Sequence, residues 1–301
     1  MKILIIGGTQ FIGRHLSFAL LKAGHQVVLF HRNKPVHSEF SAFKHIIGDR
    51  RLPLDTKLAG DFDLLIDTCA FEPVDLDLLS SISFRKYVFI SSVAVYGSEI
   101  PEGQMEDAAK ISTDAMEYSN SSVNSYGQLK KLTEDLVVER YPNSIILRPS
   151  VVIGPGDNSG RLEKIFEKHV QGNSLWAPIS LDNSLVTQFI DVRDLVQLSL
   201  EIISRGLTGS FNLVGKTTKW NDFLTSIAAV AGLGLMDKDC EVFPLWDTTK
   251  SRGLRTLQSS YNFIRDYNFT TLGVSLEDWF YEYQISVKTS KTNPVQSDLR
   301  E

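Results

Sequence analysis

The feature that most constrains this chain is a glycine-rich turn placed directly after a short apolar run at the N-terminus. The run Ile3–Ile6 has the length and composition of a buried strand, and the turn reads Gly7-Gly8-Thr9-Gln10-Phe11-Ile12-Gly13. Between a strand and a helix, such a turn brings backbone N–H groups and the positive helix N-terminus against a pyrophosphate. All residues of the turn are therefore candidates for binding a dinucleotide, with a purely structural turn as the alternative.

A helix and a series of short strands are predicted to follow the turn. Ile12, Leu16 and Leu20 repeat every four positions, which indicates a helix with one apolar face that ends at Gly24. Further strands are predicted at Val27–Phe30, His45–Ile47, Leu64–Asp67, Tyr87–Ser91 and Ser144–Leu147. Strands that alternate with amphipathic stretches are typical of βαβ units, so we predict an α/β protein with a Rossmann-like, doubly wound parallel sheet.

The pattern loosens after Val151, which indicates a smaller C-terminal substrate lobe. We expect residues 1–150 to form a dinucleotide-binding domain to which 186–215 return, and 151–185 with 216–285 to form the substrate lobe. Residues 286–301 are polar and lack periodicity, and are expected to be a tail. Beyond a turn at Gly154–Asp157, the predicted elements are helices at Leu162–Val170, Trp220–Ala231 and Leu276–Ile285, a strand and helix over Phe189–Leu200, a strand at Ser210–Val214 and an irregular stretch at Trp176–Asn183.

The end of the second predicted strand bears on the choice of nucleotide. A dinucleotide site commonly has a carboxylate there for the adenosine ribose, but this strand ends Phe30-His31-Arg32-Asn33-Lys34. Arg32, helped by Lys34, can pair with a 2′-phosphate, which favours NADP over NAD, unless it is a solvated loop charge. We assign His31 and Arg32 to the cofactor site. Asp49 and Arg50 are assigned there as well, because Asp49 can accept from the adenine amino group, although it can equally cap a helix.

A tyrosine and a lysine four residues apart form the second candidate site. Tyr126 and Lys130 lead into Leu132–Val138, a stretch of helical composition, so that both side chains share one helix face. A nearby ammonium lowers the pKa of a tyrosine from about 10 towards neutral pH, which makes Tyr126 a candidate acid/base for a carbonyl/alcohol couple. An isolated match of this spacing also occurs by chance.

Two serines end the fifth predicted strand, at the sheet edge where open α/β folds bind ligands. Ser91 and Ser92 precede Val95-Tyr96-Gly97, and Ser92 is placed to hydrogen-bond a reacting oxygen and polarise it. The alternative is a serine that satisfies backbone groups at a strand end. Its position beside the glycine turn and the Tyr–Lys pair favours the functional interpretation.

In this order the motifs resemble the short-chain dehydrogenase/reductase superfamily, in its extended and atypical branch, the NAD-dependent epimerase/dehydratase family. The resemblance also rests on Arg148-Pro149 leading to Gly154-Pro155-Gly156, and on Phe189-Ile190-Asp191-Val192-Arg193-Asp194. It implies that Ser92, Tyr126 and Lys130 are the catalytic triad and that Lys130 also holds the nicotinamide ribose. It further implies a homodimer formed through the Tyr–Lys helix, and cofactor contacts by Thr68, Cys69, Ala70, Ser91 and Pro149.

Two residues depart from the pattern of this family. Gln10 occupies the place of the middle glycine, and Thr187 stands where sugar-nucleotide epimerases present a phosphate-binding arginine. The motifs are most similar to an atypical subgroup that includes bacterial reductase-like proteins and chloroplast stem-loop RNA-binding proteins. We therefore predict an NAD(P)-dependent enzyme acting on a hydroxyl or carbonyl group of a small molecule, such as a sugar or nucleotide sugar. The alternative is a non-catalytic protein that senses nucleotides or binds RNA.

Composition argues against several other classes of protein. The formal charge is 31 − 36 = −5 and there is no long basic run, which disfavours nucleic acid as a partner. The N-terminal apolar run is shorter than the stretch of about 20 residues that a membrane helix needs, and too short for a secretory signal. Cys69 and Cys240 have neither metal-ligand nor disulfide spacing, so we expect a cytoplasmic protein without a metal.

Several conspicuous residues are given structural interpretations. Cys69 has no histidine or aspartate partner in the sequence and is expected to pack rather than act as a nucleophile. Asp191 and Asp194 are expected to cap the helix that follows them and to order the junction of the lobes. The histidines His31, His37 and His45 are expected to face solvent, and the tryptophans Trp176, Trp220, Trp246 and Trp279 to lie in the core or an interface.

Overall fold

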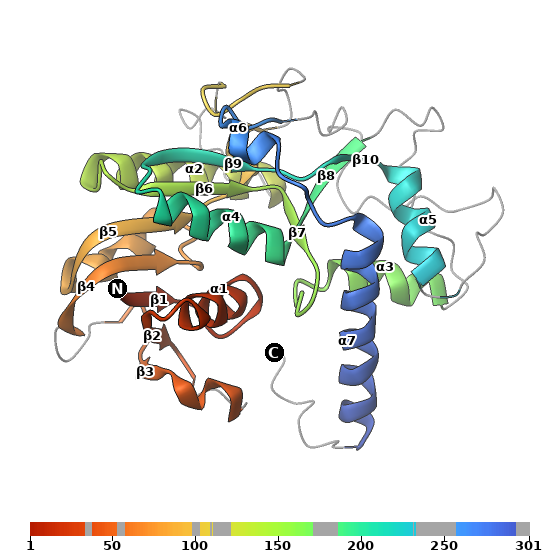
Figure 1. Cartoon of the computed structure of the whole chain (residues 1–301), viewed down its shortest axis with the longest axis horizontal. Coiled ribbons are helices and arrows are strands. Elements are labelled where there is room, and N and C mark those ends of the chain that lie inside the picture. Colours follow the sequence, from red (N-terminus) through yellow and green to blue (C-terminus); the bar gives the residue numbers. More distant parts are fainter. Residues whose placement is uncertain are drawn as a thin grey trace.

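A parallel sheet of seven strands forms the centre of the larger part of the molecule (Figure 1). The computed structural model describes residues 1–33, 38–52, 58–97, 103–108, 110, 122–170, 186–230, 232 and 257–292. The strand order is β3-β2-β1-β4-β5-β6-β9. Strands β2 and β3 are added on one side of β1 and the later strands on the other, so the switch point of the sheet lies between β1 and β4. This confirms the predicted doubly wound fold, whose strands are β1 (Lys2–Ile6), β2 (Gln26–His31), β3 (Lys44–Ile47), β4 (Leu58–Asp67), β5 (Ile82–Ile90), β6 (Ile145–Pro149) and β9 (Gly209–Leu213).

Both faces of this sheet are covered, which is why its strands are nearly continuous apolar runs. Ile3 and Ile5 face the layer that holds α1 (Phe11–Lys22) and α4 (Val192–Ser204). Leu4 and Ile6 alternate with them and face the layer formed by the 3₁₀ segment η2 (Pro73–Ser81) and helix α2 (Ser122–Arg140). The sheet therefore separates two apolar clusters and leaves its carboxyl edge for ligands.

A second, three-stranded sheet belongs to the smaller part of the molecule. Its order is β10-β8-β7, with β7 (Val151–Ile153) parallel to β8 (Val186–Asp191) and β10 (Thr217–Lys219) antiparallel to it. Helices α3 (Arg161–Val170), α5 (Trp220–Val230) and α7 (Leu272–Thr292) lie beside this sheet in Figure 1, and a short helix α6 (Asn262–Arg265) precedes α7. Their shared cluster includes Leu162, Phe223 and Trp279, which confirms the core role predicted for that tryptophan.

Several predicted boundaries differ from the structure, among them those of the returning segment and of the final helix. The segment 186–215 contributes α4 and β9 to the larger sheet region, but its first strand, β8, pairs with β7 and β10. The final helix runs over Leu272–Thr292, so it is longer than the predicted Leu276–Ile285 and includes the start of the predicted tail. The prediction follows the apolar periodicity of the sequence, which ends before the helix does. A helix can continue beyond its apolar face because its backbone hydrogen bonds are formed within the helix itself. Residues 293–301 and the stretch Trp176–Asn183 lie outside the described residues.

Asp191 caps α4 as the sequence predicts, whereas Asp194 lies in the first turn of that helix and binds Thr270 instead of capping. Asp191 is the N-cap of α4 and accepts a hydrogen bond from the Arg193 backbone N–H at 2.7 Å. Asp194 accepts from the backbone N–H of Thr270 at 2.6 Å and from its hydroxyl at 2.9 Å. Asp194 thus connects α4 to the segment leading into α7. Within the part of the chain that the structure describes, no helix is long and apolar enough to span a membrane.

Candidate active site at the carboxyl edge of the sheet

The glycine turn between β1 and α1 has no room for side chains at its glycines. A Cβ at Gly13 would lie 2.1 Å from the carbonyl oxygen of Gly7, because α1 packs directly on the end of β1. Gly7 has φ +83°, and a Cβ there would lie 2.5 Å from Thr68 Oγ1 and 3.1 Å from Cys69 Sγ. Gly13 thus allows α1 to pack closely on β1, while its role in binding a dinucleotide stays a prediction, and residues at the end of β4 form the floor of the turn.

The N-terminus of α1 is arranged to attract an anion. Gln10 is its N-cap but makes no side-chain capping hydrogen bond, and the first turn contains no acidic residue. Phe11 has a φ of +31°, a left-handed conformation that costs a non-glycine residue about 1–3 kcal/mol and is found mainly at functional sites. An uncapped helix N-terminus beside a glycine turn fits the pyrophosphate of a dinucleotide.

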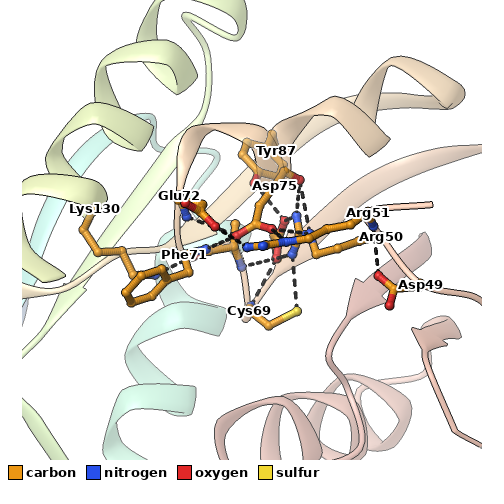
Figure 2. A network of polar contacts seen from close by, with 11 residues as sticks. Asp49, Arg50, Arg51, Cys69, Phe71, Glu72, Asp75, Tyr87 and Lys130 are labelled. Atoms are coloured by element: carbon orange, nitrogen blue, oxygen red, sulfur yellow. Dashed lines mark hydrogen bonds and ion pairs between the residues drawn. The ribbon is translucent and has the colours of Figure 1, made fainter. Parts of the chain in front are cut away.

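A buried ion-pair network lies beside this turn (Figure 2). Arg50 donates from Nη1 to Asp67 Oδ1 at 3.0 Å and from Nη2 to Asp67 Oδ2 at 2.7 Å. The Tyr87 hydroxyl donates to the same carboxylate at 3.1 Å, and Arg50 also donates to the carbonyl of Asp75. Asp67 has no exposed surface, so the Arg50 guanidinium supplies the positive charge that its burial requires. The cofactor role predicted for Arg50 stays a prediction.

Asp49 and Cys69 lie at the margins of this network. Asp49 Oδ1 accepts from the Arg51 backbone N–H at 2.9 Å and closes a turn rather than starting a helix, so the capping alternative is not observed. Cys69 Sγ lies 3.3 Å from Arg50 Nη1. Burial of the sulfur, followed by the charge of Asp67, raises the pKa of the Cys69 thiol to about 11, although part of the residue is exposed. A thiol that stays protonated supports the non-nucleophilic interpretation.

Tyr126 and Ser92 are brought together by the packing of α2 on the 3₁₀ segment η3 (Val93–Tyr96). A Cβ at Gly127 would lie 2.3 Å from the carbonyl oxygen of Ala94, so only glycine allows α2 this close. Ser92 is the N-cap of η3, and its hydroxyl accepts from the Ala94 backbone N–H at 3.2 Å. Burial raises the pKa of Tyr126, and the neighbouring Ser92 side chain lowers it. Gly127 therefore determines the proximity of the two predicted catalytic hydroxyls.

Lys130 lies one turn further along α2 and is 5% exposed. Its Nζ donates to the carbonyl oxygen of Ala70 at 2.6 Å and to that of Ile90 at 2.9 Å. The same ammonium lies 4.8 Å from the centre of the Phe89 ring. Burial lowers the pKa of Lys130 to about 8. The ammonium has three donors, so one remains beyond the two carbonyls for a bound group.

The predicted effect of Lys130 on the tyrosine is wrong. Burial raises the pKa of Tyr126, and the groups that lower it are the side chain of Ser92 and the charge of Arg161. Lys130 is not among the groups that act on this pKa, and its ammonium is bonded to the backbone carbonyls of Ala70 and Ile90. Arg161, the first residue of α3, was not identified from the sequence. An arginine directly after Gly160 at a predicted helix start was the available signal.

Two histidines predicted to face solvent lie instead within the sheet edge. His31 is 8% exposed, and its Nε2 lies 2.8 Å from His45 Nδ1. The Nε2 of His45 donates to the carbonyl of Phe40 at 2.9 Å. The reason is that β2 extends to His31 and the neighbouring strand β3 begins at Lys44, so both rings lie on paired strands. Arg32 follows β2 and is exposed, while Lys34 and His37 lie outside the described residues.

Two serines lie directly after strands of the larger sheet; Ser91 is a predicted site residue and Ser150 is not. Ser91, after β5, and Ser150, after β6, are buried, and their hydroxyls have no hydrogen-bond partner among the described residues. Buried hydroxyls of this kind need a partner, and both lie at the carboxyl edge where a ligand is expected, next to Pro149. Thr187 is 1% exposed in β8 opposite Thr218, so this position presents no side chain to a substrate phosphate. No group of three possible metal ligands occurs among the described residues.

Solved structures share the fold. UDP-glucuronic acid 4-epimerase from Bacillus cereus in complex with NAD superposes with a TM-score of 0.74 at 20% sequence identity, covering 95% of this chain and 99% of that chain. The Bordetella bronchiseptica enzyme WbmH in complex with NAD⁺ gives a TM-score of 0.73 at 16% identity, covering 94% and 98%. At these identities the likeness establishes the fold alone.

Sequence comparison identifies a relative and a family. Chloroplast stem-loop binding protein of 41 kDa b from Arabidopsis thaliana is 30% identical in an alignment of 254 residues that covers 77% of this chain and 63% of the relative. The chain thus spans less than two thirds of that protein's length. Residues 74–214, which contain the serine, tyrosine and lysine described above, match the sequence model of the NAD dependent epimerase/dehydratase family. The motifs of the sequence agree with this match, so over residues 74–214 the chain is similar to the NAD dependent epimerase/dehydratase family.

Proposed function

We propose that this protein is an NAD(P)-dependent epimerase/dehydratase or reductase that acts on a hydroxyl or carbonyl group of a sugar, with a nucleotide sugar as the first class to test. The observation that carries the proposal is the close packing of α2 on η3 at Gly127, which brings Tyr126 near enough to Ser92 for Ser92 to act on its pKa, with Lys130 one helical turn away. These groups lie at the carboxyl edge of the same sheet as the glycine turn. The NAD-bound neighbours of the same fold support the class of cofactor.

Each residue of the site has a distinct part in this proposal. A bound nicotinamide supplies the hydride chemistry at the substrate carbon. Tyr126 moves the proton of the reacting hydroxyl, Ser92 orients the oxygen, and the remaining Lys130 donor holds a ribose hydroxyl. The charge of Arg161 favours the phenolate form of Tyr126, opposing the effect of burial on the pKa of that tyrosine.

The decisive variant is Tyr126→Phe, which removes the hydroxyl and keeps the ring. Wild type and variant are incubated with NAD⁺ and a panel of UDP-sugars, and separately with carbonyl compounds and reduced nicotinamide. We expect conversion by the wild type to fall at least about 100-fold in the variant, the order of a lost acid/base group. Tyr281→Phe is the matched control, because Tyr281 is 67% exposed on α7. A Tyr126→Phe variant that binds cofactor and turns over at the wild-type rate would refute the mechanism.

A second function is favoured by one observation, the 30% identity to a stem-loop binding protein. In this alternative the chain binds structured RNA or senses a nucleotide without catalysis. The net charge of −5 argues against it, because RNA affinity depends largely on phosphate contacts. A gel shift with stem-loop RNA at increasing salt tests the alternative. Salt-sensitive binding together with no turnover across both panels would make it the better reading.

A further inference from the structure

The turn Gly154–Asn158, between β7 and α3, lies against the N-terminal half of α1. Asn158 Nδ2 donates to Gln10 Oε1 at 3.0 Å, although 148 residues separate the two in sequence. A second contact joins His15 Nε2 to the carbonyl oxygen of Pro155 at 2.9 Å. Burial lowers the pKa of His15, which keeps the ring neutral at neutral pH with Nε2–H as the donor. Two hydrogen bonds therefore hold this turn against the dinucleotide-binding helix.

The smaller part of the molecule supports the turn from the opposite side. A Cβ at Gly154 would lie 3.1 Å from Asp191 Oδ2, so the chain passes directly over that carboxylate. Asp191 in turn accepts from the Ser275 hydroxyl of α7 at 2.6 Å and pairs with Arg193. Gly154 has φ +123°, in the region that favours glycine. The position of the turn is thus determined by both α1 and the lobe that contains α7.

The same stretch of chain leads into α3, whose first residue acts through its charge on the candidate catalytic tyrosine. Three residues after Asn158, α3 begins at Arg161, whose charge lowers the pKa of Tyr126 against the effect of burial. One end of this segment therefore contacts the N-cap of α1, where a pyrophosphate is expected, and the other end acts on Tyr126. A dinucleotide bound across the switch point of a doubly wound sheet extends between these two places.

We propose that Gln10 and Asn158 form a clasp that closes the segment 154–161 over the pyrophosphate and slows release of the cofactor. Gln10 stands where this family's pattern has a glycine, and its amide gives the turn a group long enough to reach Asn158. The inference rests on the proposed function only in requiring a dinucleotide on the glycine turn. A cofactor that stays bound suits a redox-neutral reaction, in which the hydride taken from the substrate is returned to it. A net reductase must instead exchange its cofactor in every turnover.

The test measures cofactor release directly. NADH is bound to the full chain, displaced with excess NAD⁺, and its dissociation rate is followed by fluorescence for wild type, Gln10→Ala, Asn158→Ala and the double variant. We expect each single variant to release NADH about fivefold faster, which corresponds to about 1 kcal/mol and to one hydrogen bond. The double variant should release it no faster than the single variants, because one interaction is lost in all three. Gln197→Ala, an exposed amide on α4, is the matched control.

The outcomes separate the clasp from the proposed function. Dissociation rates that are unchanged in both single variants, or effects that add in the double variant, overturn the clasp and leave the dinucleotide site intact. A wild-type protein that binds neither NADH nor NADPH overturns both proposals. Thermal unfolding of each variant identifies misfolding, and Gln10→Asn, which keeps the amide but shortens its reach, is expected to release NADH as fast as Gln10→Ala.

Discussion

Lys130 is expected to make the free energy of unfolding of this protein rise with pH in the alkaline range. Its side chain is 5% exposed, and burial lowers its pKa from 10.5 to about 8. Asp67 and Glu134 raise the pKa but do not offset burial. The unfolded chain therefore keeps the Lys130 proton to a higher pH than the folded protein does.

The magnitude follows from the difference between the two pKa values. The difference of 10.5 − 8, about 2.5 units at about 1.36 kcal/mol each, corresponds to a cost of about 3 kcal/mol for the buried charge. Because the unfolded state binds more protons between these values, the free energy of unfolding rises with pH there. The cost is fully present below about pH 8 and is lost as the pH approaches 10.5. Relative to a Lys130→Met variant, the wild type should gain about 3 kcal/mol over this interval.

The assay is urea unfolding of both proteins from pH 7 to 10.5. The comparison at a single pH is uninformative, because methionine removes the charge but also leaves the carbonyl groups of Ala70 and Ile90 without their donor. Lys131→Met, which removes the adjacent, partly exposed lysine, controls for the loss of a basic residue from α2. Unfolding free energies of wild type and Lys130→Met that change in parallel with pH would refute the reasoning.

Three further variants test the packing and charge of the site. In Gly127→Ala the new methyl group must move about 3.4 − 2.3 = 1.1 Å from the Ala94 carbonyl, which should cost about 1–3 kcal/mol in urea unfolding and raise the pKa of Tyr126 in a tyrosinate titration. Asp67→Asn leaves the buried Arg50 without its counter-charge and should lower stability by about 3–5 kcal/mol. Arg32→Ala should weaken the binding of NADPH but not that of NADH. A thermal-shift titration measures this, because ligand at about 100 times its Kd adds about 2.7 kcal/mol to the stability of the folded protein.

Each of these has a control or a contrary outcome. Gly273→Ala, at a helical glycine with open space around it, should be neutral or slightly stabilising, so equal losses at both glycines would show that contact with Ala94 is unimportant. An Asp67→Asn protein as stable as the wild type would mean that Arg50 is hydrated in the folded state. If Arg32→Ala lost affinity for NADPH and NADH equally, the Arg32 guanidinium would not contact a 2′-phosphate.

The parts of the site that could be predicted from sequence are those built within one short segment. The glycine turn followed by a helix is visible in the sequence because adjacent residues meet the steric needs of one turn. Tyr126 and Lys130 share a helix face by spacing alone. By contrast, His31 was predicted to face solvent, because its burial depends on the neighbouring strand that carries His45.

The sequence by itself determined the order of strands and helices, the position of the glycine turn and the residue types at the sheet edge, because hydrophobic period and turn chemistry act over a few residues. Only the tertiary structure decided which charged and polar side chains meet. Arg50 and Asp67 are 17 residues apart, and Gln10 and Asn158 are 148 apart. Such pairs arise where chain segments are packed together by the burial of other residues, and no local periodicity encodes them.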